Sequence, residues 1–194
     1  KNIDVICILT SGGSKFTTAL TLQSVSGNPV YQDLFSLTDE NEMGHIRLAQ
    51  EVEAILVAPA SANMIASMAN GTANNLASAT LLASNKPVII APSMNTRMWD
   101  HPATKKNIEI LASRAVKILG PEEGEMACGE IGIGRMLEPL EIVKFVHSQL
   151  KNSNLLAGLT ALVTSGPTFE PIDVIRFIGN RSSGKQGHAI AAAL

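Results

Sequence analysis

The stretch EAILVAPASAN, residues 53–63, decides the fold. Its first part, 53–58, is a mostly apolar run of strand length, and small and hydroxyl-bearing residues follow it. A continuous apolar run without polar alternation is typical of a strand that is buried on both faces of a parallel sheet. Ser61 and Asn63 can cap a helix that begins at this point. The stretch therefore predicts a strand, a tight turn and a helix in succession, which is the building unit of an α/β protein.

Similar units lie on both sides of this stretch. Apolar runs of strand length occur at 4–9, 87–91 and 115–119. Segments with helical periodicity occupy 16–25, 43–50, 62–68, 75–84, 102–113 and 139–150. The alternation predicts a doubly wound parallel sheet with helices on both faces, and polar residues at 32–42 and five glycines within 120–135 predict loops. Because the first strand begins almost at residue 1, we expect this domain, 1–150, to be N-terminally truncated and to lack its first strand.

A second domain is predicted to begin near the end of the chain. Residues 151–157 are polar and then irregular, and we interpret them as a linker. An apolar run at 159–164 predicts a new strand, which a Gly/Pro loop, an Arg/Ser/Gly stretch and a helix start follow. Residues 158–194 therefore predict the first strand–helix unit of another α/β domain. A piece of about 40 residues is too short to bury a hydrophobic core alone.

Composition narrows the class of protein. The 194 residues are 45% hydrophobic and 16% charged, which is typical of a folded globular chain. A net charge of −2 gives no basic excess for nucleic acid or an anionic membrane, and no apolar run reaches the roughly 20 residues of a membrane span. Cys7 and Cys128 are too few for a disulfide framework, and the start has no signal-peptide pattern, so we expect a cytoplasmic location.

Small and polar residues follow three of the predicted strands. Thr10 and Ser11 come after the first, Ser61 after the central one, and Ser93 and Asn95 after the next. In an open parallel sheet, ligands bind beyond the carboxyl ends of the strands. Small residues let a planar ligand approach the backbone, and a hydroxyl-rich turn can hold phosphate. These loops predict one planar, phosphorylated ligand, while simple helix capping is the alternative role for Ser61 and Asn95.

Two further residues have the chemistry of catalysts. Cys128 lies in a glycine-rich loop, where a cysteine can act as a nucleophile or a proton donor, although it can also be an incidental thiol. His45 begins a predicted helix, and a histidine side chain can exchange a proton near neutral pH, although a surface histidine without function is the alternative. No HExxH and no paired CxxC occurs, so we predict no metal site. The segment GNRSSGKQ has Gln186 where a P-loop needs Ser or Thr, which argues against a P-loop.

The segments PASAN, PSMNTRMW and ACGEIGIGRML occur in this order and together are more specific than any one of them. They resemble the homo-oligomeric flavin-containing cysteine decarboxylases. The closer resemblance is to the bifunctional bacterial enzymes of coenzyme A synthesis, which join a phosphopantothenoylcysteine decarboxylase to a phosphopantothenate–cysteine ligase. The sequences LQSVSGNPV, MGHIRLA, GPEEGEMACGEIGIGRMLEP and TSGPTFEPIDVIRFIGNRSSGKQG are all similar to that family, so the resemblance covers the whole chain. It implies a flavodoxin-like, Rossmann-like sheet.

The resemblance implies a role for each matching residue. His45 is similar to the family's catalytic histidine, Asn95 to the asparagine that holds the substrate carboxylate, and Cys128 to the flap cysteine that protonates the product. Ala127 and Gly129 join Asn95 and Cys128 in binding the substrate. The implied FMN contacts are Thr10, Ser11, Ser61, Ala62, Asn63, Met64 and Ser93. In the ligase part, Arg176 and Asn180 resemble residues that act on an acyl-cytidylate intermediate, and the implied nucleotide loop contains Ser182, Ser183 and Gly184.

The implied reaction is the FMN-dependent decarboxylation of 4'-phosphopantothenoylcysteine to 4'-phosphopantetheine. FMN first oxidises the thiol-bearing carbon to a thioaldehyde, so that the carbanion left by CO₂ is delocalised, and Cys128 supplies a proton. The parent protein also performs a ligation with CTP and Mg²⁺, but this chain has only the start of that domain, and we expect no ligase activity from it. The resemblance further implies a small-molecule substrate and a trimer-based homo-oligomer, with neither nucleic acid nor a membrane as partner.

Two alternative hypotheses stay open. In one, the truncated chain is an inactive fold remnant or an assembly module, which retained flavin would exclude. In the other, the chain is a related flavin-dependent cysteine decarboxylase with another substrate. The tail segments GPTFEP and NRSSGKQG argue against the second alternative, because they resemble the fused enzyme.

Overall fold

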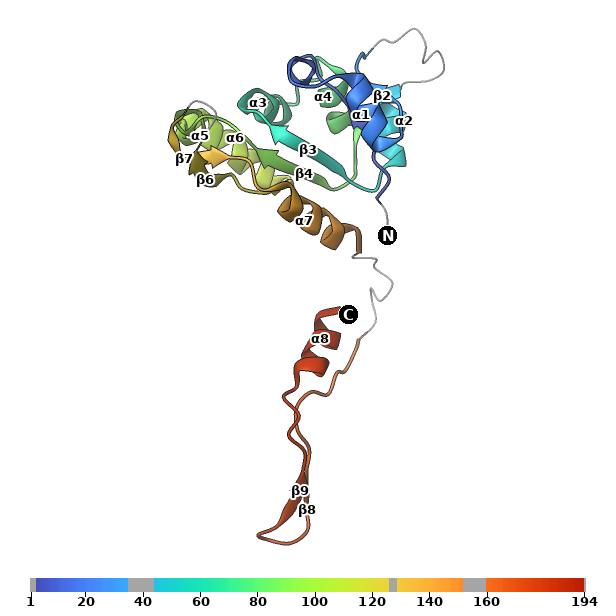
Figure 1. Ribbon diagram of the computed structural model, residues 1–194, viewed down its shortest axis with the longest axis vertical. Helices are drawn as coiled ribbons and strands as arrows, with labels where there is room; N and C mark the ends of the chain where they lie inside the picture. Colours follow the sequence, from blue (N-terminus) through green and yellow to red (C-terminus); the bar gives the residue numbers. More distant parts are fainter. Residues whose placement is uncertain (1–2, 35–43, 126–128, 152–159, 194) are drawn as a thin grey trace. The chain divides into compact units, whose positions relative to one another are not determined.

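The computed structural model describes residues 3–34, 44–125, 129–151 and 160–193. The chain divides into two compact units, unit 1 (residues 1–150) and unit 2 (residues 151–194), and each is described by itself. Unit 1 alternates short strands with helices, whereas the described residues of unit 2 form one hairpin and one helix (Figure 1).

The strands of unit 1 confirm the prediction of a parallel α/β fold. They are β1 (Cys7–Ile8), β2 (Val30–Tyr31), β3 (Ile55–Ala60), β4 (Val88–Pro92), β5 (Lys117–Ile118), β6 (Glu122–Glu125) and β7 (Ile131–Arg135). β1 pairs in parallel with β2, and a second parallel sheet has the order β3–β4–β5. The sequence missed the two-residue strand β2, which has no apolar run of its own.

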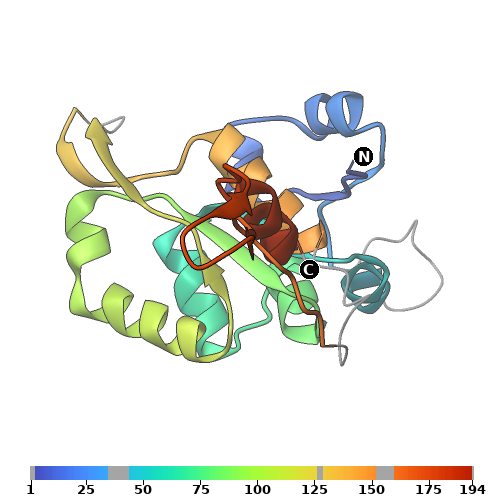
Figure 2. The same ribbon diagram turned by 90° about the horizontal axis from the view of Figure 1, so that it is seen from below.

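Helices cover both faces of the sheet formed by β3, β4 and β5. The helices of unit 1 are α1 (Ala19–Ser26), α2 (Gly44–Glu51), α3 (Ala62–Asn70), α4 (Leu76–Ala83), α5 (Thr96–Asp100), α6 (Pro102–Ser113) and α7 (Pro139–Lys151). α3 and α6 pack against each other, as do α2 and α4. Figure 2 shows α7, drawn in orange, on the other side of the strands from α3 and α6.

Capping side chains set where several helices begin. Ser61 Oγ accepts a hydrogen bond from the backbone N–H three residues later, at the start of α3. Asn75 and Ser78 form a reciprocal capping box at the start of α4. Thr18 caps α1 in the same way, after a short 3₁₀ turn. The predicted helix at 16–25 therefore begins too early, because the Thr18 cap places the first helical residue after it.

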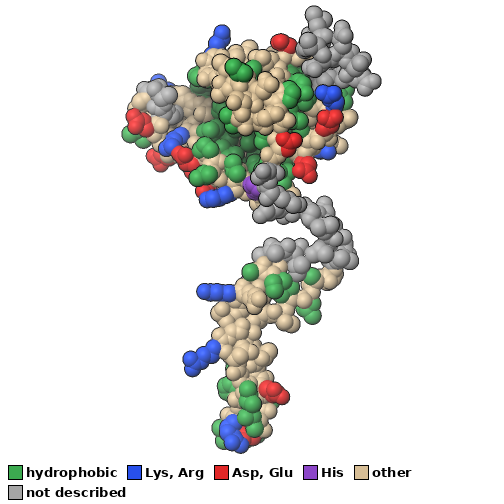
Figure 3. Space-filling model, turned by 45° about the vertical axis from the view of Figure 1, so that its right-hand side comes forward, with side chains coloured by type: hydrophobic (Ala, Val, Ile, Leu, Met, Phe, Trp, Pro, Cys, Tyr) green, Lys and Arg blue, Asp and Glu red, His purple; other side chains and the backbone are tan. Residues whose placement is uncertain are grey.

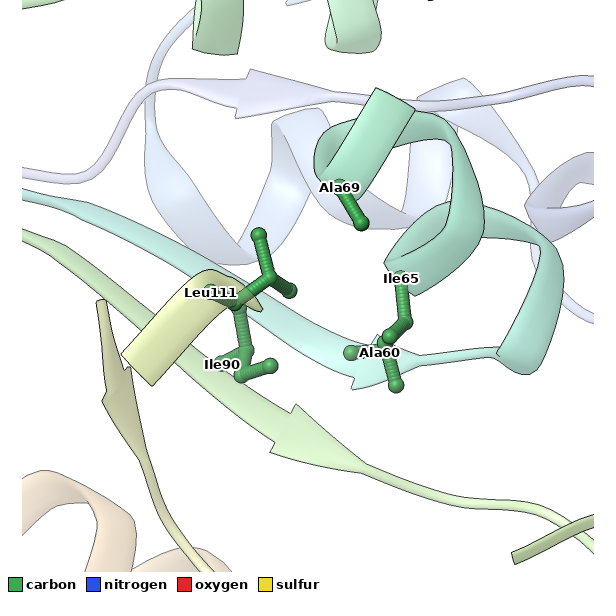
Figure 4. Close-up of a cluster of buried hydrophobic side chains, with 5 residues drawn as sticks. All are labelled: Ala60, Ile65, Ala69, Ile90 and Leu111. Carbon is green, nitrogen blue, oxygen red and sulfur yellow. The ribbon is translucent and has the colours of Figure 1, made fainter. Parts of the chain in front are cut away.

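A cluster of five buried apolar side chains lies between β3, β4, α3 and α6. Its members are Ala60, Ile65, Ala69, Ile90 and Leu111, and none is more than 4% exposed. Figure 4 shows them pointing toward one another from the two strands and the two helices. This cluster fixes α3 and α6 on the sheet, and with them the turns at the carboxyl ends of β3 and β4.

The prediction of a loop at residues 120–135 is wrong, because these residues contain two paired strands. β6 and β7 pair as an antiparallel hairpin, in which Gly124 and Gly132 face each other across the strands. Ile131 and Ile133 alternate with glycines at the period of a strand. The glycines are typical of loops, and they concealed this period in the sequence.

The described part of unit 2 contains the antiparallel strands β8 (Phe169–Pro171) and β9 (Phe177–Gly179), followed by helix α8 (Lys185–Ala193). The rings of Phe169 and Phe177 meet edge to face, with centroids 5.1 Å apart. The strand predicted at 159–164 is wrong for its described residues, 160–164, which pair with no described strand. An apolar run becomes a strand only beside a partner, and in unit 2 the two strands pair with each other.

The face of unit 1 in Figure 3 carries acidic and basic side chains interspersed among apolar ones. This face has no continuous basic stripe of the kind that binds nucleic acid. Among the described helices, none is long and apolar enough to cross a membrane.

Truncation of Leu111 tests the buried cluster. Leu111→Ala should lower the free energy of unfolding by about 2–5 kcal/mol, because it leaves a cavity beside the sheet. Leu82→Ala is the matched control, since Leu82 is 60% exposed and its truncation should cost about 0.5 kcal/mol or less. Urea denaturation followed by Trp99 fluorescence measures both variants. Equal losses in the two variants would contradict the assigned core.

Candidate functional site

The candidate site lies at the carboxyl ends of β3 and β4. β3 turns into α3 through Ser61, and β4 turns into α5 through residues 93–95. A backbone hydrogen bond of 3.1 Å from the Ser93 N–H to the Ala60 carbonyl joins the two turns. The parallel pairing of the strands therefore brings Ser61 and Ser93 to the same edge of the sheet.

Asn95 is the N-cap of α5, which was the alternative role considered for this residue. Its Oδ1 accepts a hydrogen bond from the Arg97 N–H at 2.8 Å. Its Nδ2 donates a hydrogen bond to Oε2 of Glu130 at 2.5 Å. Because the cap holds the oxygen of the amide, the nitrogen is the end that faces the Glu130 carboxylate.

The hairpin of β6 and β7 is attached to the turn after β4 at three points. The Met94 N–H donates to the Gly134 carbonyl at 3.0 Å. Gly132 lies so close to Thr96 that an added Cβ would be 2.6 Å from Oγ1 of Thr96. The third attachment is the hydrogen bond between Asn95 and Glu130. The hairpin therefore forms one wall of the candidate site.

A cavity of about 580 Å³ opens between this turn and the hairpin, which is within the usual size of small-molecule sites. Its lining consists of Ser93, Met94, Asn95, Glu125, Gly134, Arg135, Met136, Leu137, Glu138 and Pro139. Arg135 and Glu138 form an ion pair, so these two lining charges compensate each other. Glu125 is the other charged residue in the lining. The cavity thus presents backbone, amide and apolar groups with a slightly negative charge.

The other residues predicted to contact a flavin fall into two places. Ala62, Asn63 and Met64 form the first turn of α3, directly beside Ser61. Thr10 and Ser11 follow β1, and their described hydrogen bonds stay within residues 10–14. No described hydrogen bond joins this turn to the ends of β3 or β4. The structure therefore places the α3 residues at the same edge of the sheet as Ser61. The flavin contacts assigned to them, and those assigned to Thr10 and Ser11, stay predictions.

Three residues predicted for catalysis or substrate binding lie wholly or partly outside the described part of the chain. His45 is in the first turn of α2, but its side chain is not described. Ala127 and Cys128 fall between β6 and β7 in sequence and are not described either. Gly129, next to them, is exposed and has a φ of 79°, a left-handed conformation that favours glycine. The roles of these four residues stay predictions.

The residues predicted for a nucleotide loop form a turn just before α8 in unit 2. Nδ2 of Asn180 donates to Oγ1 of Thr168, and Oδ1 of Asn180 accepts from the Ser182 N–H, both at 3.0 Å. Ser183 is exposed, and Gly184 is buried with a φ of 74°. Hydrogen bonds within unit 2 therefore fix the path of this turn.

Arg176, the remaining residue predicted for the ligase, belongs to the turn between β8 and β9. The Asp173 carboxylate accepts hydrogen bonds from the backbone N–H groups of Arg176 at 2.8 Å and Ile175 at 2.9 Å. It also pairs with the Arg176 guanidinium at 2.6 Å. These donors favour the charged form and lower the pKa of Asp173 below its usual value.

Comparison with known proteins agrees with this geometry. The flavoprotein family matches residues 1–151, and the DNA/pantothenate metabolism flavoprotein C-terminal domain matches residues 156–194. This chain belongs to the flavoprotein family. The resemblance inferred from the sequence segments is confirmed.

The flavoprotein has curated relatives along its whole length. It is 46% identical over 193 residues to the coenzyme A biosynthesis bifunctional protein CoaBC of Escherichia coli strain K12, and 43% identical over 192 residues to CoaBC of Bacillus subtilis strain 168. These alignments cover 100% and 98% of this chain but 48% and 47% of the relatives. The chain therefore spans about half the length of the curated relatives it matches.

Solved structures share the fold of the flavoprotein. A PPC decarboxylase variant complexed with pantothenoylaminoethenethiol aligns with a TM-score of 0.68 and 26% identity, covering 77% of this chain and 84% of that one. The FMN binding protein AtHal3 aligns with a TM-score of 0.64 and 28% identity, covering 75% and 81%. Both alignments support the flavodoxin-like class expected for the sheet.

Sequence reasoning missed several residues of the site. Glu130, Arg135 and Glu138 belong to it, although no pattern in the sequence predicts a role for them. The signal for a hairpin wall was the spacing of Ile131 and Ile133, which places neighbouring residues on opposite faces. The pairing of Glu130 with Asn95 had no local signal, because the two residues are 35 positions apart.

The contact between Gly132 and Thr96 gives a test of how the hairpin is attached. Gly132→Ala should lower the free energy of unfolding by about 1–3 kcal/mol, because the new methyl group overlaps Thr96. Adding Thr96→Ala leaves only the contact to Cβ of residue 96, at 3.4 Å, and should recover part of this loss. Urea denaturation of the two single variants and the double variant measures the coupling. Strictly additive losses would contradict the contact.

The turn between β8 and β9, which contains Asp173, should respond to acid. Because the folded pKa of Asp173 is lowered, its carboxylate stabilises the turn above the ordinary pKa of aspartate, and this contribution is lost as the pH falls through the folded value. We expect acid to shift the amide resonances of Ile175 and Arg176 in the wild type and to leave them nearly unchanged in Asp173→Asn. An NMR titration measures this, with Asp33→Asn as a control that keeps the wild-type response. A full acid shift in Asp173→Asn would contradict the assignment.

Proposed function

We propose that this chain carries the FMN-dependent decarboxylase part of an enzyme of coenzyme A biosynthesis. Its substrate is 4'-phosphopantothenoylcysteine, and its products are 4'-phosphopantetheine and CO₂. Asn95 carries the proposal: its amide lines a cavity at the edge of the sheet, and its nitrogen already donates to a carboxylate. The flavoprotein family, the CoaBC relatives and the PPC decarboxylase neighbour support it.

The residues at the end of β3 suit FMN. Ser61 and Ala62 are small and are not buried, so a planar ring can approach the backbone there. The first N–H groups of α3 have no partner inside the helix, and such groups bind phosphate or a ring carbonyl. We assign the flavin contacts at this edge to Ser61, Ala62, Asn63, Met64 and Ser93, and the phosphate contact to Thr10 and Ser11.

Asn95 binds and orients the carboxylate that leaves. Its Oδ1 accepts the hydrogen bond from the Arg97 N–H, which leaves Nδ2 as the donor for a ligand. The direction of the hydrogen bond to the carboxylate is therefore set before substrate arrives. A neutral amide orients the carboxylate without the strong ground-state stabilisation that a cation would give to a charge about to be lost. FMN, when bound, supplies the oxidation of the thiol-bearing carbon that makes CO₂ loss possible.

Cys128 and His45 complete the proposed chemistry. Cys128 lies next to Gly129 in the chain, between the two strands of the hairpin wall, and we assign to its thiol the proton that the product needs. Ala127 and Gly129 flank it as backbone contacts to the substrate. His45, in the first turn of α2, is the second titratable group of the proposed site.

For the longer protein we propose a second activity, the CTP- and Mg²⁺-dependent ligation of phosphopantothenate to cysteine. The relatives are named as bifunctional, and residues 156–194 match a separate C-terminal domain family. The ordered turn before α8 supports a nucleotide loop at 182–184, with Asn180 and Arg176 acting on the acyl-cytidylate.

The proposed enzyme is a trimer-based homo-oligomer in the cytoplasm. Phe16, Leu20 and Val25, in and just before α1, are 93%, 77% and 85% exposed. Neighbouring exposed apolar side chains of this kind are typical of protein–protein contacts. They support an assembly in which this surface is covered.

Two measurements test the decarboxylase. We expect the chain to retain the visible absorption of added FMN on a desalting column and to release CO₂ from 4'-phosphopantothenoylcysteine. Asn95→Ala should retain FMN but lower kcat/KM by about 10²–10³-fold, because the carboxylate loses its oriented donor. Asn85→Ala, an exposed asparagine before β4, is the matched control and should stay within about twofold of wild type.

The outcomes separate clearly. If the wild type neither retains flavin nor releases CO₂, the proposed function is wrong for this chain. If the wild type is active and Asn95→Ala is equally active, the role of Asn95 is wrong while the activity stands.

A further inference from the structure

Glu130 forms a hydrogen bond with Asn95 that joins two distant segments of the chain at the candidate site. Its carboxylate accepts a hydrogen bond from Nδ2 of Asn95 at 2.5 Å, although the two residues are 35 positions apart in sequence. The opposite end of the Asn95 amide is held by the Arg97 N–H at 2.8 Å. The amide is therefore fixed with its nitrogen toward a carboxylate of the protein itself.

The position of Glu130 follows from the attachment of the hairpin. The hydrogen bond from Met94 to Gly134 and the close approach of Gly132 to Thr96 fix the strand that Glu130 precedes. None of the ion pairs among the described residues includes Glu130, whereas the lining charges Arg135 and Glu138 pair with each other. Asn95 is thus the described partner that holds the Glu130 carboxylate.

We propose that Glu130 occupies the carboxylate-binding amide of Asn95 until substrate arrives, and that the substrate carboxylate must displace it. This inference rests on the proposed function. The Asn95 nitrogen has two N–H groups, but two charged carboxylates at hydrogen-bond distance from it repel each other, so the arriving carboxylate displaces Glu130. Glu130 is therefore a specificity-determining residue that competes with every ligand bearing a carboxylate at this position.

The competition between Glu130 and a bound carboxylate changes the affinity of the substrate but not that of the product. It weakens the binding of the carboxylate-bearing substrate and leaves the decarboxylated product unaffected, since that product offers nothing for Asn95 to bind in its place. Loss of CO₂ returns the Asn95 amide to Glu130. Removal of Glu130 should raise the affinity for the substrate form alone, by about fivefold, because an exposed carboxylate holds its donor only moderately.

Two non-reactive ligands test the proposal on the FMN-loaded chain. One is 4'-phosphopantothenoylserine, which keeps the carboxylate but has a hydroxyl in place of the thiol. The other is 4'-phosphopantothenoylethanolamine, which lacks the carboxylate. Isothermal titration calorimetry gives both dissociation constants for wild type, Glu130→Ala and Glu130→Gln. We expect Glu130→Ala to bind the serine ligand about fivefold more tightly and the ethanolamine ligand within about twofold of wild type.

Two further variants serve as controls. One tests whether the effect of the alanine variant comes from misfolding, and the other tests whether it comes from a change of net charge. Glu130→Gln keeps a neutral acceptor of the same size, so it should shift affinity in the same direction by a smaller factor, and it replaces the alanine variant if that one fails to fold. Glu123→Gln removes an equal charge from an exposed position of β6 outside the cavity lining and leaves the described contact of Asn95 in place. It should therefore leave the ratio of the two dissociation constants unchanged.

Each result has one meaning. A tighter serine ligand with an unchanged ethanolamine ligand supports displacement. Equal shifts for both ligands, no shift, or weaker binding of the serine ligand would overturn it. If the wild type binds neither ligand, the proposed function itself fails, and the inference fails with it.

Discussion

The parallel pairing of β3 with β4 is the constraint on which the candidate site depends. It places two strand ends at one edge of the sheet, and the hydrogen bond from Ser93 to Ala60 continues the pairing into the turns. The cluster around Ile65 and Leu111 then holds α3 and α6 on the same face. The side chains of Ser61 and Asn95, which cap the following helices, are thereby fixed at this edge of the sheet, where Asn95 lines the cavity.

The hairpin of β6 and β7 adds the second half of the site. Glycine makes this possible, because Gly132 lets the strand approach α5 more closely than any side chain would permit. The same approach brings Gly134 to the backbone of Met94 and the Glu130 carboxylate to Asn95. One backbone hydrogen bond, one close approach of a glycine to Thr96 and one side-chain hydrogen bond therefore position the wall together.

The parts of the fold that sequence predicted are those that depend on local pattern. β3 and β4 follow from their apolar runs, and the caps of α3 and α5 follow from polar side chains two or three residues before the N–H groups they bind. The hairpin was missed because the pairing of Gly124 with Gly132 carries no hydrophobic signal. The strand predicted at 159–164 failed because its apolar run has no described neighbour to pair with. The contact of Glu130 with Asn95 depends on tertiary structure and has no counterpart in either segment alone.

The start of α3 has a consequence for the electrostatics of this edge. The positive potential there comes from peptide N–H groups at the first turn after Ser61, and no Lys or Arg lies within α3 or next to Ser61. Peptide dipoles neither gain nor lose protons as the pH changes. An anion attracted to this edge by the helix start is therefore held by a field that does not titrate, for as long as the sheet keeps the helix in place.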